Sequence, residues 1–555
     1  MCPVSASLAF VPAKTAERKR TPLVLLLLVL VVGAILRVYS LGAESFYFDE
    51  AYSVWAARHS VTWLLALSTQ RIFPPLYYLL LHFWLVFGES EFAVRSLSVV
   101  LGLVSITAIY VLATQLFDTR VGLLSAWLLA ISPLHLWFSQ EARMYMLVFT
   151  LNLCSACLVL SVVREGRRRQ WLAYVLTTAL AMSTHYFTLF LALFENAYVA
   201  YLLLRRRLRR GFWKQWALSQ VAIAVLSAIG LAGVFSEESD YWWGLLDTLH
   251  GPATWRDLVS TVLKFSLGPL VGGRLAYVVA LSLFGFCAAW AVLRLRPSAP
   301  TAPEDRAVTM RGFASGFGWQ RLALDWDDAL VFVLLYLVVP IGAIFLVSQF
   351  RSFWVLRYLF PFLPPYCILA SRGIARMPGR ALPALLTAGI VLASSWPVAD
   401  MYRFQQKEDW RGAVQYIAAH EQPGDLLLMV DEDLWLPFEH YYQGAMSHLG
   451  VSRTITDRDF LAARAGLAAS SHRRIWLVLS HTENQMLKEY LMTSGYTKLA
   501  SERHFASVEV DLFTVQPTLA ATSLSGGLAH PATPWRTRGA VAANAGRSTG
   551  LAGSN

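Results

Sequence analysis

Long apolar runs separated by short basic loops recur along this chain, and they decide what it can fold into. From Val24 onward, stretches of about 20 mainly apolar residues follow one another, each long enough to cross a bilayer as a helix. Charged residues make up 15% of the 555 residues, against about 25% in soluble domains, and the mean hydropathy is +0.48. The sequence therefore predicts a multi-spanning α-helical membrane protein.

The first apolar run, residues 21–41, follows a basic segment and has the layout of a signal peptide. Its apolar stretch is longer than the roughly 7–15 residues usual there, and no clear small-residue cleavage site follows it. We therefore expect an uncleaved first span, preceded by a cytoplasmic segment of residues 1–20.

The arginine clusters orient the spans. The net charge is +11, and the arginines gather in short loops at 164–169, 205–210 and 372–380. Basic residues concentrate in the cytoplasmic loops of membrane proteins, where they also meet anionic headgroups. This placement favours membrane lipids over nucleic acid as the partner of the positive charge.

With the basic loops inside, the chain threads about eleven times through the membrane, with its N-terminus inside and its C-terminus outside. The predicted spans are residues 21–41, 92–116, 121–138, 144–163, 171–184, 187–204, 215–235, 272–293, 329–348, 353–371 and 381–399. Residues 42–91 become the first outer loop. The apolar stretch 74–88 within that loop is predicted to lie along the interface, because counting it as a span would expose three arginine clusters outside.

Three further regions complete the predicted organisation. Residues 21–399 form the transmembrane domain, and residues 400–517 alternate helical and strand-like patterns typical of a small extracytoplasmic α/β domain. Residues 518–555 are rich in small and polar residues without periodicity, which predicts a disordered tail.

No soluble-enzyme motif offers an alternative chemistry. The sequence has no phosphate-binding P-loop, no His-Glu-x-x-His zinc motif and no glycine-rich dinucleotide fingerprint. Cys154 and Cys157 form a CxxC pattern, but inside an apolar span, where small core residues are the expected reading. We expect no cofactor, and the sequence gives no support for a metal.

Ionisable residues gather at the predicted outer ends of the spans. Placing an ionisable group near the bilayer core is energetically unfavourable, so such groups usually face a cavity or a partner. Arginines can clamp a phosphate with paired hydrogen bonds, and a carboxylate can take a proton from an attacking hydroxyl. The candidates are Asp49, Glu50, Arg71, Glu141, Arg143, His185, Arg351 and Arg357.

Each candidate also has a structural interpretation. Asp49 could be the N-cap of a helix that starts near Glu50. Glu141 and Arg143 could form an exposed ion pair, and His185 could be a packed interfacial histidine. Arg351 and Arg357 could extend toward lipid headgroups.

The order of several short motifs resembles the GT-C glycosyltransferases that use a polyprenyl-phosphate sugar. These include the protein O-mannosyltransferases and the lipid A aminoarabinose transferases. The motifs lie within roughly residues 20–430. They are Phe48-Asp49-Glu50-Ala51-Tyr52, Pro74-Pro75-Leu76-Tyr77-Tyr78, Phe87 to Arg95, Gln140 to Tyr145, Thr184-His185-Tyr186, Arg357-Tyr358-Leu359 and Asp409 to Val414.

This resemblance implies an inverting sugar transfer on the extracytoplasmic face of the cell membrane. The donor would be a polyprenyl-phosphate sugar, and the acceptor a protein, glycan or lipid. Asp49 matches the family's catalytic base, with Glu50 beside it, and Glu141 matches a second acidic residue. The residues expected to bind substrate are Arg71, Tyr78, Arg143, Tyr145, His185, Arg351 and Arg357.

The chain departs from the aminoarabinose-transferase pattern just before the double proline. That branch carries Glu-Lys there, whereas this sequence reads Ile72-Phe73. This sequence therefore has no counterpart at these two positions for the lysine that contacts phosphate or for the glutamate that contacts metal, and Arg71 is the alternative to the lysine. A transporter or lipid flippase, or a non-catalytic envelope protein, remains the alternative function.

Overall fold

The computed structural model describes residues 14–70, 74–231, 251–269, 274–293, 326–351, 353–404, 406–430, 434–451, 472–480, 486–493, 496–498 and 503–515. Two compact units divide the chain. The helical unit comprises Met1–Glu421, Glu432–Ala445 and His504–Glu509, and the sheet unit comprises the rest. Residues 400–421 thus belong to the helical unit, while the predicted outer domain from residue 400 stays a prediction.

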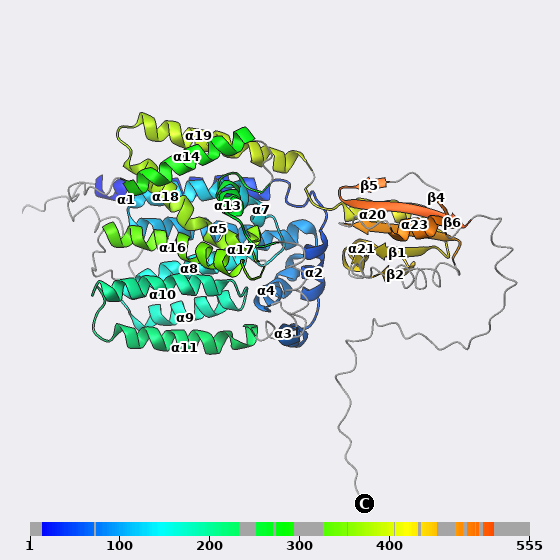
Figure 1. Ribbon diagram of the computed structural model, residues 1–555, viewed down its shortest axis with the longest axis horizontal. Coiled ribbons are helices and arrows are strands. Elements are labelled where there is room, and N and C mark those ends of the chain that lie inside the picture. Colours follow the sequence, from blue (N-terminus) through cyan, green and yellow to red (C-terminus); the bar gives the residue numbers. More distant parts are fainter. Residues whose placement is uncertain are drawn as a thin grey trace, which may run out of the picture. The chain divides into compact units, whose positions relative to one another are not determined.

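Long helices run alongside one another in the helical unit (Figure 1). They overlap the segments in which the sequence predicts spans, although residues 356–362 of the predicted span 353–371 form the short elements α17 Leu356–Leu359 and η3 Phe360–Phe362. The long helices, with the short α7 that continues α6, are α1 Lys14–Val38, α5 Glu91–Leu116, α6 Thr119–Ala130, α7 Pro133–Ser139, α8 Tyr145–Arg164, α9 Arg168–Met182, α10 Thr188–Leu204, α11 Phe212–Leu231, α14 Arg274–Leu293, α16 Trp326–Val347, α18 Leu363–Arg376 and α19 Ala381–Arg403.

Within the described residues, five helices are long and apolar enough to cross a membrane, and there are six if the bent pair α6 and α7 is counted as one span. The five are Thr21–Val38, Glu91–Leu116, Tyr145–Arg164, Asp328–Val347 and Ala381–Arg403. These helices fit a membrane protein, while eleven spans and their orientation stay predictions.

The break between α6 and α7 is stabilised from both sides. Ser132 caps the start of α7, since its hydroxyl accepts from the backbone N–H of His135 at 3.4 Å. The buried Arg37 of α1 donates to the carbonyls of Ala130 at 3.0 Å and Leu129 at 3.4 Å. A cation at the end of a helix complements the partial negative charge there. This contact holds α7, which leads directly into residues 140–144.

The short helices α2 Phe48–Ala57, α3 Val61–Gln70 and α4 Leu76–Trp84 lie together at one end of the bundle in Figure 1. Other short elements of this unit are the 3₁₀ turn η1 Leu85–Phe87, α13 Trp255–Leu267, α17 Leu356–Leu359 and the 3₁₀ turn η3 Phe360–Phe362. The apolar helix Leu76–Phe87 falls short of the ~20 residues that a span needs. The α20 helix Trp410–His420 and the α21 helix Trp435–Tyr441 also belong to the helical unit.

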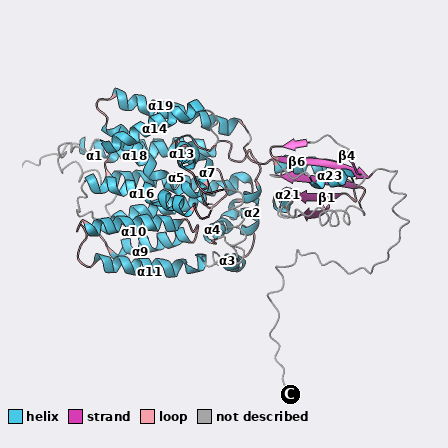
Figure 2. Cartoon of the chain, in the orientation of Figure 1, coloured by secondary structure: helices cyan, strands magenta, loops and turns pink. Residues whose placement is uncertain are grey.

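The later part of the chain forms a mixed sheet (Figure 2). Its strands are β1 Leu426–Val430, β2 Ser447–Val451, β3 Arg474–Ser480, β4 Tyr496–Lys498, β5 Arg503–Phe505 and β6 Val508–Val515, accompanied by α23 Met486–Thr493. The order is β2-β1-β3-β6-β4, with β1 parallel to β2 and β3, β4 antiparallel to β6, and β5 beside β6. Buried Leu428, Leu477 and Phe513 pack against α23 in the core. The predicted tail, 518–555, lies outside the described residues.

Candidate active site

The acidic pair Asp49–Glu50 opens helix α2. The N-cap of this helix is Tyr47, so Asp49 does not occupy the N-cap position that the structural interpretation would require. Acidic side chains in a first turn are stabilised by the helix dipole. Because consecutive helical residues point about 100° apart, the two carboxylates face different surroundings.

Glu50 is fully buried and holds four chain segments together. Arg95 of α5 donates to both of its oxygens, at 2.9 and 2.6 Å. Lys407 donates to Oε1 at 3.0 Å, and the backbone N–H of Ala142 donates to the same oxygen at 2.8 Å. Burial alone would raise the pKa of Glu50, but Arg95 and Lys407 hold it at about 2. Both Glu50 oxygens already accept hydrogen bonds from the protein. Glu50 therefore fits a structural role better than a catalytic one.

Asp49 has looser contacts. Its Oδ2 lies 3.9 Å from Arg143 Nε and 4.0 Å from Arg357 Nη1, and its side chain is 29% exposed. Arg143 donates from Nη1 to the Asp49 carbonyl oxygen at 3.0 Å and to Ser53 Oγ at 3.3 Å. The carboxylate therefore faces two cations and remains within reach of a ligand.

The two arginines carry unsatisfied donors. The Nε–H groups of Arg143 and Arg357 are buried without a hydrogen-bond partner among the described residues. Arg143 lies 6.0 Å from the ring of Tyr145, and Arg357 lies 5.5 Å from the ring of Tyr358. Burial would lower the pKa of Arg143, but the Asp49 carboxylate and nearby phenols raise it well above its ordinary value. Two fixed cations with spare donors suit an anionic oxygen ligand.

Glu141 is a second buried carboxylate. Its Oε1 accepts from Trp137 Nε1 at 2.8 Å, while its Oε2 is buried without a hydrogen-bond partner among the described residues. Burial raises the pKa of Glu141 to about 7, with Lys407 opposing this rise and Glu50 and Asp49 adding to it. A group with this pKa changes its charge near neutral pH and can act as an acid or a base.

Tyr145 and His185 lie close to the same two arginines, and Tyr78 lies close to Arg143. Tyr78 is buried beside Arg143 and Asp49, and buried Tyr145 is under the influence of both cations. His185 is buried, and its Nδ1 accepts from the backbone N–H of Phe187 at 3.2 Å. Burial, then Arg357 and Arg143, lower the pKa of His185 to about 3, so this imidazole is neutral at physiological pH.

Two predicted residues are not part of this cluster. Arg351 lies on the exposed turn that follows α16, and the contacts above do not include it. Arg71 lies outside the described residues.

Three neighbours of the cluster were not among the predicted site residues. They are Arg95, Lys407 and Trp137, which contact Glu50 or Glu141 directly. Arg95 ends one of the family-like motifs, and this is the signal that could have identified it. Lys407 is 357 residues from Glu50 in the chain and belongs to no pattern.

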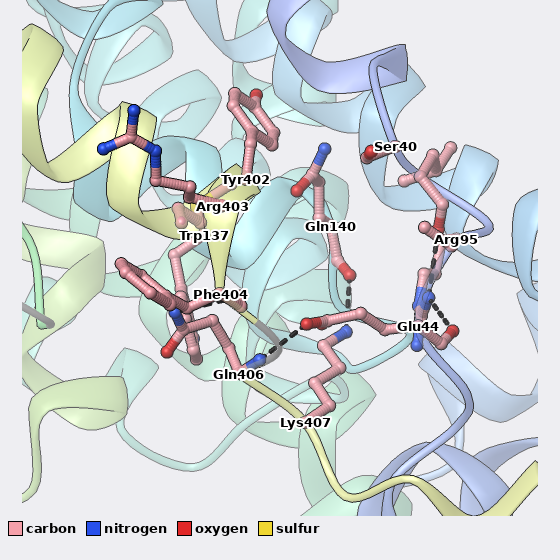
Figure 3. Close-up of a pocket in the computed structure, with 13 residues that line it drawn as sticks. Ser40, Glu44, Arg95, Trp137, Gln140, Tyr402, Arg403, Phe404, Gln406 and Lys407 are labelled. Atoms are coloured by element: carbon pink, nitrogen blue, oxygen red, sulfur yellow. Dashed lines mark hydrogen bonds between the residues drawn. The ribbon is translucent and has the colours of Figure 1, made fainter. Parts of the chain in front are cut away.

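A cavity of about 240 Å³ opens beside these residues. Figure 3 shows Arg95, Lys407, Gln140 and Glu44 on its wall. Its full lining is Ser40, Leu41, Ala43, Glu44, Arg95, Trp137, Gln140, Met401, Tyr402, Arg403, Phe404, Gln406 and Lys407.

The described part of the chain contains no group of three or more His, Cys, Asp or Glu residues arranged to hold a metal ion. Glu50 cannot serve as a ligand without breaking its contacts to Arg95 and Lys407. The absence of a metal or cofactor stays a prediction.

This helical bundle, with its acidic first loop facing two arginines, has the fold of the GT-C glycosyltransferases. Residues 73–231 match the family model described as dolichyl-phosphate-mannose-protein mannosyltransferase. No curated protein matches the chain by sequence.

Solved structures support the same fold. The chain is similar to ArnT from Cupriavidus metallidurans in the apo state, with a TM-score of 0.55, 15% identity and coverage of 90% of this chain and 99% of that chain. The same protein bound to undecaprenyl phosphate gives a TM-score of 0.54, with equal identity and coverage. The Archaeoglobus fulgidus oligosaccharyltransferase in the apo form gives 0.50, with 11% identity and coverage of 83% and 70%. The resemblance inferred from the motifs is thereby confirmed.

Proposed function

We propose that this protein is a membrane glycosyltransferase that moves a sugar from a polyprenyl-phosphate donor to a hydroxyl-bearing acceptor outside the cytoplasm. The observation that carries the proposal is the partly exposed Asp49 carboxylate between Arg143 and Arg357, at 3.9 and 4.0 Å. In the displacement of a lipid phosphate, a base can accept the proton of the attacking hydroxyl, and two cations can stabilise the departing phosphate.

Two comparisons support the choice of donor. The matching family is described by a dolichyl-phosphate mannose donor, and a structure of similar fold is described with undecaprenyl phosphate bound. Both are polyprenyl phosphates. The unsatisfied Nε–H groups of Arg143 and Arg357 are suitable donors for phosphate oxygens.

The proposed step is a single inverting displacement. Asp49 accepts the proton of the acceptor hydroxyl, and the oxygen attacks the anomeric carbon from the side opposite the phosphate. The bond between that carbon and the phosphate oxygen breaks, and the polyprenyl phosphate leaves with the bonding electrons. Arg143 and Arg357 stabilise the negative charge that develops on the phosphate. Positioning of donor and acceptor supplies further acceleration.

The remaining residues have supporting roles in this proposal. Glu141 accepts a hydrogen bond from the acceptor through its unpaired Oε2, and it does so in its ionised form. Tyr78, Tyr145 and neutral His185 line the phosphate side, while donor binding by Arg71 and Arg351 stays a prediction from the sequence. Glu50 keeps the first loop in place.

The test is transfer by the full-length protein reconstituted in lipid vesicles. Synthetic polyprenyl-phosphate sugars that differ in the sugar are offered with peptide, glycan and glycolipid acceptors, and both released polyprenyl phosphate and glycosylated product are measured. We expect one donor to be consumed, with an inverted anomeric configuration in the product by NMR. Asp49→Asn should be inactive, whereas Glu89→Gln, which alters an exposed carboxylate paired with Arg58, should be active. Turnover of no donor by the folded wild type would contradict the proposal.

A further inference from the structure

A segment that follows the last long helix packs against the loop that leads to Asp49. We call residues 406–411 the return segment. The backbone N–H of Gln406 donates to Glu44 Oε1 at 2.6 Å, and Ser45 Oγ donates to the Glu408 carbonyl at 2.6 Å. Arg411 donates from Nη2 to Glu91 Oε1 at 2.5 Å. The return segment therefore fixes the chain on both sides of Glu44 and Ser45, a few residues before Asp49.

Lys407 is the residue of this segment that reaches deepest. Its side chain is 9% exposed, and its Nζ donates to Glu50 Oε1 at 3.0 Å and to the Gln140 carbonyl at 2.9 Å. The backbone N–H of Ala142 donates to the same Glu50 oxygen at 2.8 Å. Residues 140 and 142 are thus both held through the Lys407–Glu50 pair, which fixes the backbone on either side of Glu141.

Lys407 also acts on Glu141 electrostatically, since its positive charge opposes the rise in the pKa of Glu141. Helix α2 brings Asp49 and Glu50 near Glu141, with the phenol of Tyr47 at the helix N-cap. Helix α7 contributes the neutral Trp137, and Lys407 supplies the positive charge, with Arg95 behind it. Without Lys407, Glu141 would lose the cation that opposes the rise in its pKa, while the carboxylates of Glu50 and Asp49, which add to that rise, would remain nearby.

We infer that Lys407 is a positioning residue for the transfer reaction, because its contacts with Glu50 and the Gln140 carbonyl hold the backbone on either side of Glu141. This inference rests on the proposed function. It assigns part of the catalytic apparatus to the return segment, which lies far along the chain from the first loop.

A pH dependence follows from this arrangement. If the ionised form of Glu141 is the active one, the rate rises with pH through its pKa of about 7. Loss of a nearby positive charge raises the pKa of a carboxyl group. Removal of Lys407 should therefore move the rising limb of the pH–rate profile to higher pH, so that the loss of activity is largest at acidic pH.

Three variants separate the charge of Lys407 from its hydrogen bonds. Lys407→Met removes both, Lys407→Gln keeps hydrogen-bond donors without charge, and Lys407→Arg keeps the charge. Arg403→Met is the matched control, because Arg403 lines the same cavity and is exposed. The pH dependence of kcat and KM is measured for each protein in vesicles, together with its unfolding temperature.

We expect the rising limb of kcat to move up by about one pH unit in Lys407→Met and Lys407→Gln, which lowers kcat at pH 6.5 by roughly tenfold. Lys407→Arg and Arg403→Met should keep the wild-type limb. If Lys407→Met fails to fold, the pair Lys407→Gln and Lys407→Arg decides the matter. An active wild type with the same limb in Lys407→Gln would overturn the inference, whereas an inactive wild type would instead contradict the proposed function.

Discussion

Asp49 and Glu50 are adjacent carboxylates on one helical turn, and the protein uses them in opposite ways. Glu50 is completely buried, with charged partners at 2.6 to 3.0 Å, whereas Asp49 is 29% exposed, with arginines at 3.9 and 4.0 Å. A buried carboxylate must be paired closely, because an uncompensated charge in the interior is very unfavourable. A carboxylate that is to accept a proton must keep an oxygen accessible. The comparison separates the residue that builds the site from the residue that is available for chemistry.

The largest effect is expected for Asp49→Asn. General base catalysis contributes about 10²- to 10⁴-fold in rate, or roughly 3–5 kcal/mol, and the amide cannot take the proton. Because the ion pairs of Asp49 are long and its side chain is partly exposed, the unfolding temperature should fall less than in Glu50→Gln. The measurement is kcat for sugar transfer together with thermal unfolding in detergent. A variant with near wild-type kcat would remove Asp49 as the base.

Glu50→Gln should instead reduce stability. The substitution leaves Arg95 and Lys407 buried without their anion, and breaking a buried ion pair on one side costs about 3–5 kcal/mol. The double variant Glu50→Gln with Arg95→Met removes one of the stranded charges and should recover part of the loss. Denaturation of the three proteins under identical conditions is the measurement. A Glu50→Gln protein as stable as wild type would contradict the role of anchor.

The pH dependence of this stability has a defined sign. The folded-state pKa of Glu50 is about 2, below its ordinary value of 4.5, so the unfolded chain binds the proton more readily. The stabilisation is therefore fully present above pH 4.5 and is lost as the pH falls toward 2. The gap in stability between wild type and Glu50→Gln should shrink over that window, and a gap that stays constant would contradict the assigned pair.

The sequence predicts the helices and the charged residues of the candidate site, but it does not predict the direction in which each side chain points. The apolar runs place the long helices, and the acidic pair and the Glu141–Arg143 pair are visible as charges next to those runs. Which of two adjacent carboxylates turns inward depends on Arg95 and Lys407, whose contacts with Glu50 are tertiary. A lysine more than 350 residues away leaves no local periodicity that could reveal its position.

Arg351 and Arg357 show the same limit of prediction from the sequence. Arg351 and Arg357 are both arginines near the start of one predicted span, and the sequence cannot rank them. The structure brings Arg357 within 4.0 Å of Asp49, whereas Arg351 lies on an exposed turn. The difference arises from helix α17, which begins at Leu356 and presents Arg357 from its first turn.

A smaller effect is expected for Arg357→Met. A charge-assisted hydrogen bond to phosphate contributes about 1.5–3 kcal/mol, so kcat/KM should fall by roughly 10- to 100-fold. Arg357→Lys should restore only part of the loss, because lysine lacks the planar fork of donors. Arg351→Met is the control and should lower kcat/KM much less. Equal losses in Arg351→Met and Arg357→Met would show that position relative to Asp49 does not matter.

The smallest effect is expected at the exposed pair Arg58–Glu89. These side chains are 43% and 46% exposed, and they approach to 2.5 Å, closer than any contact of Asp49. An exposed ion pair nevertheless contributes only about 0–1 kcal/mol, because water and salt screen it. Glu89→Gln should therefore leave activity unchanged and lower stability slightly, with the difference vanishing in high salt. If it lowered stability as much as Glu50→Gln, separation rather than burial would set the strength of these pairs. The contrast between Asp49 and Glu50 would then need another cause.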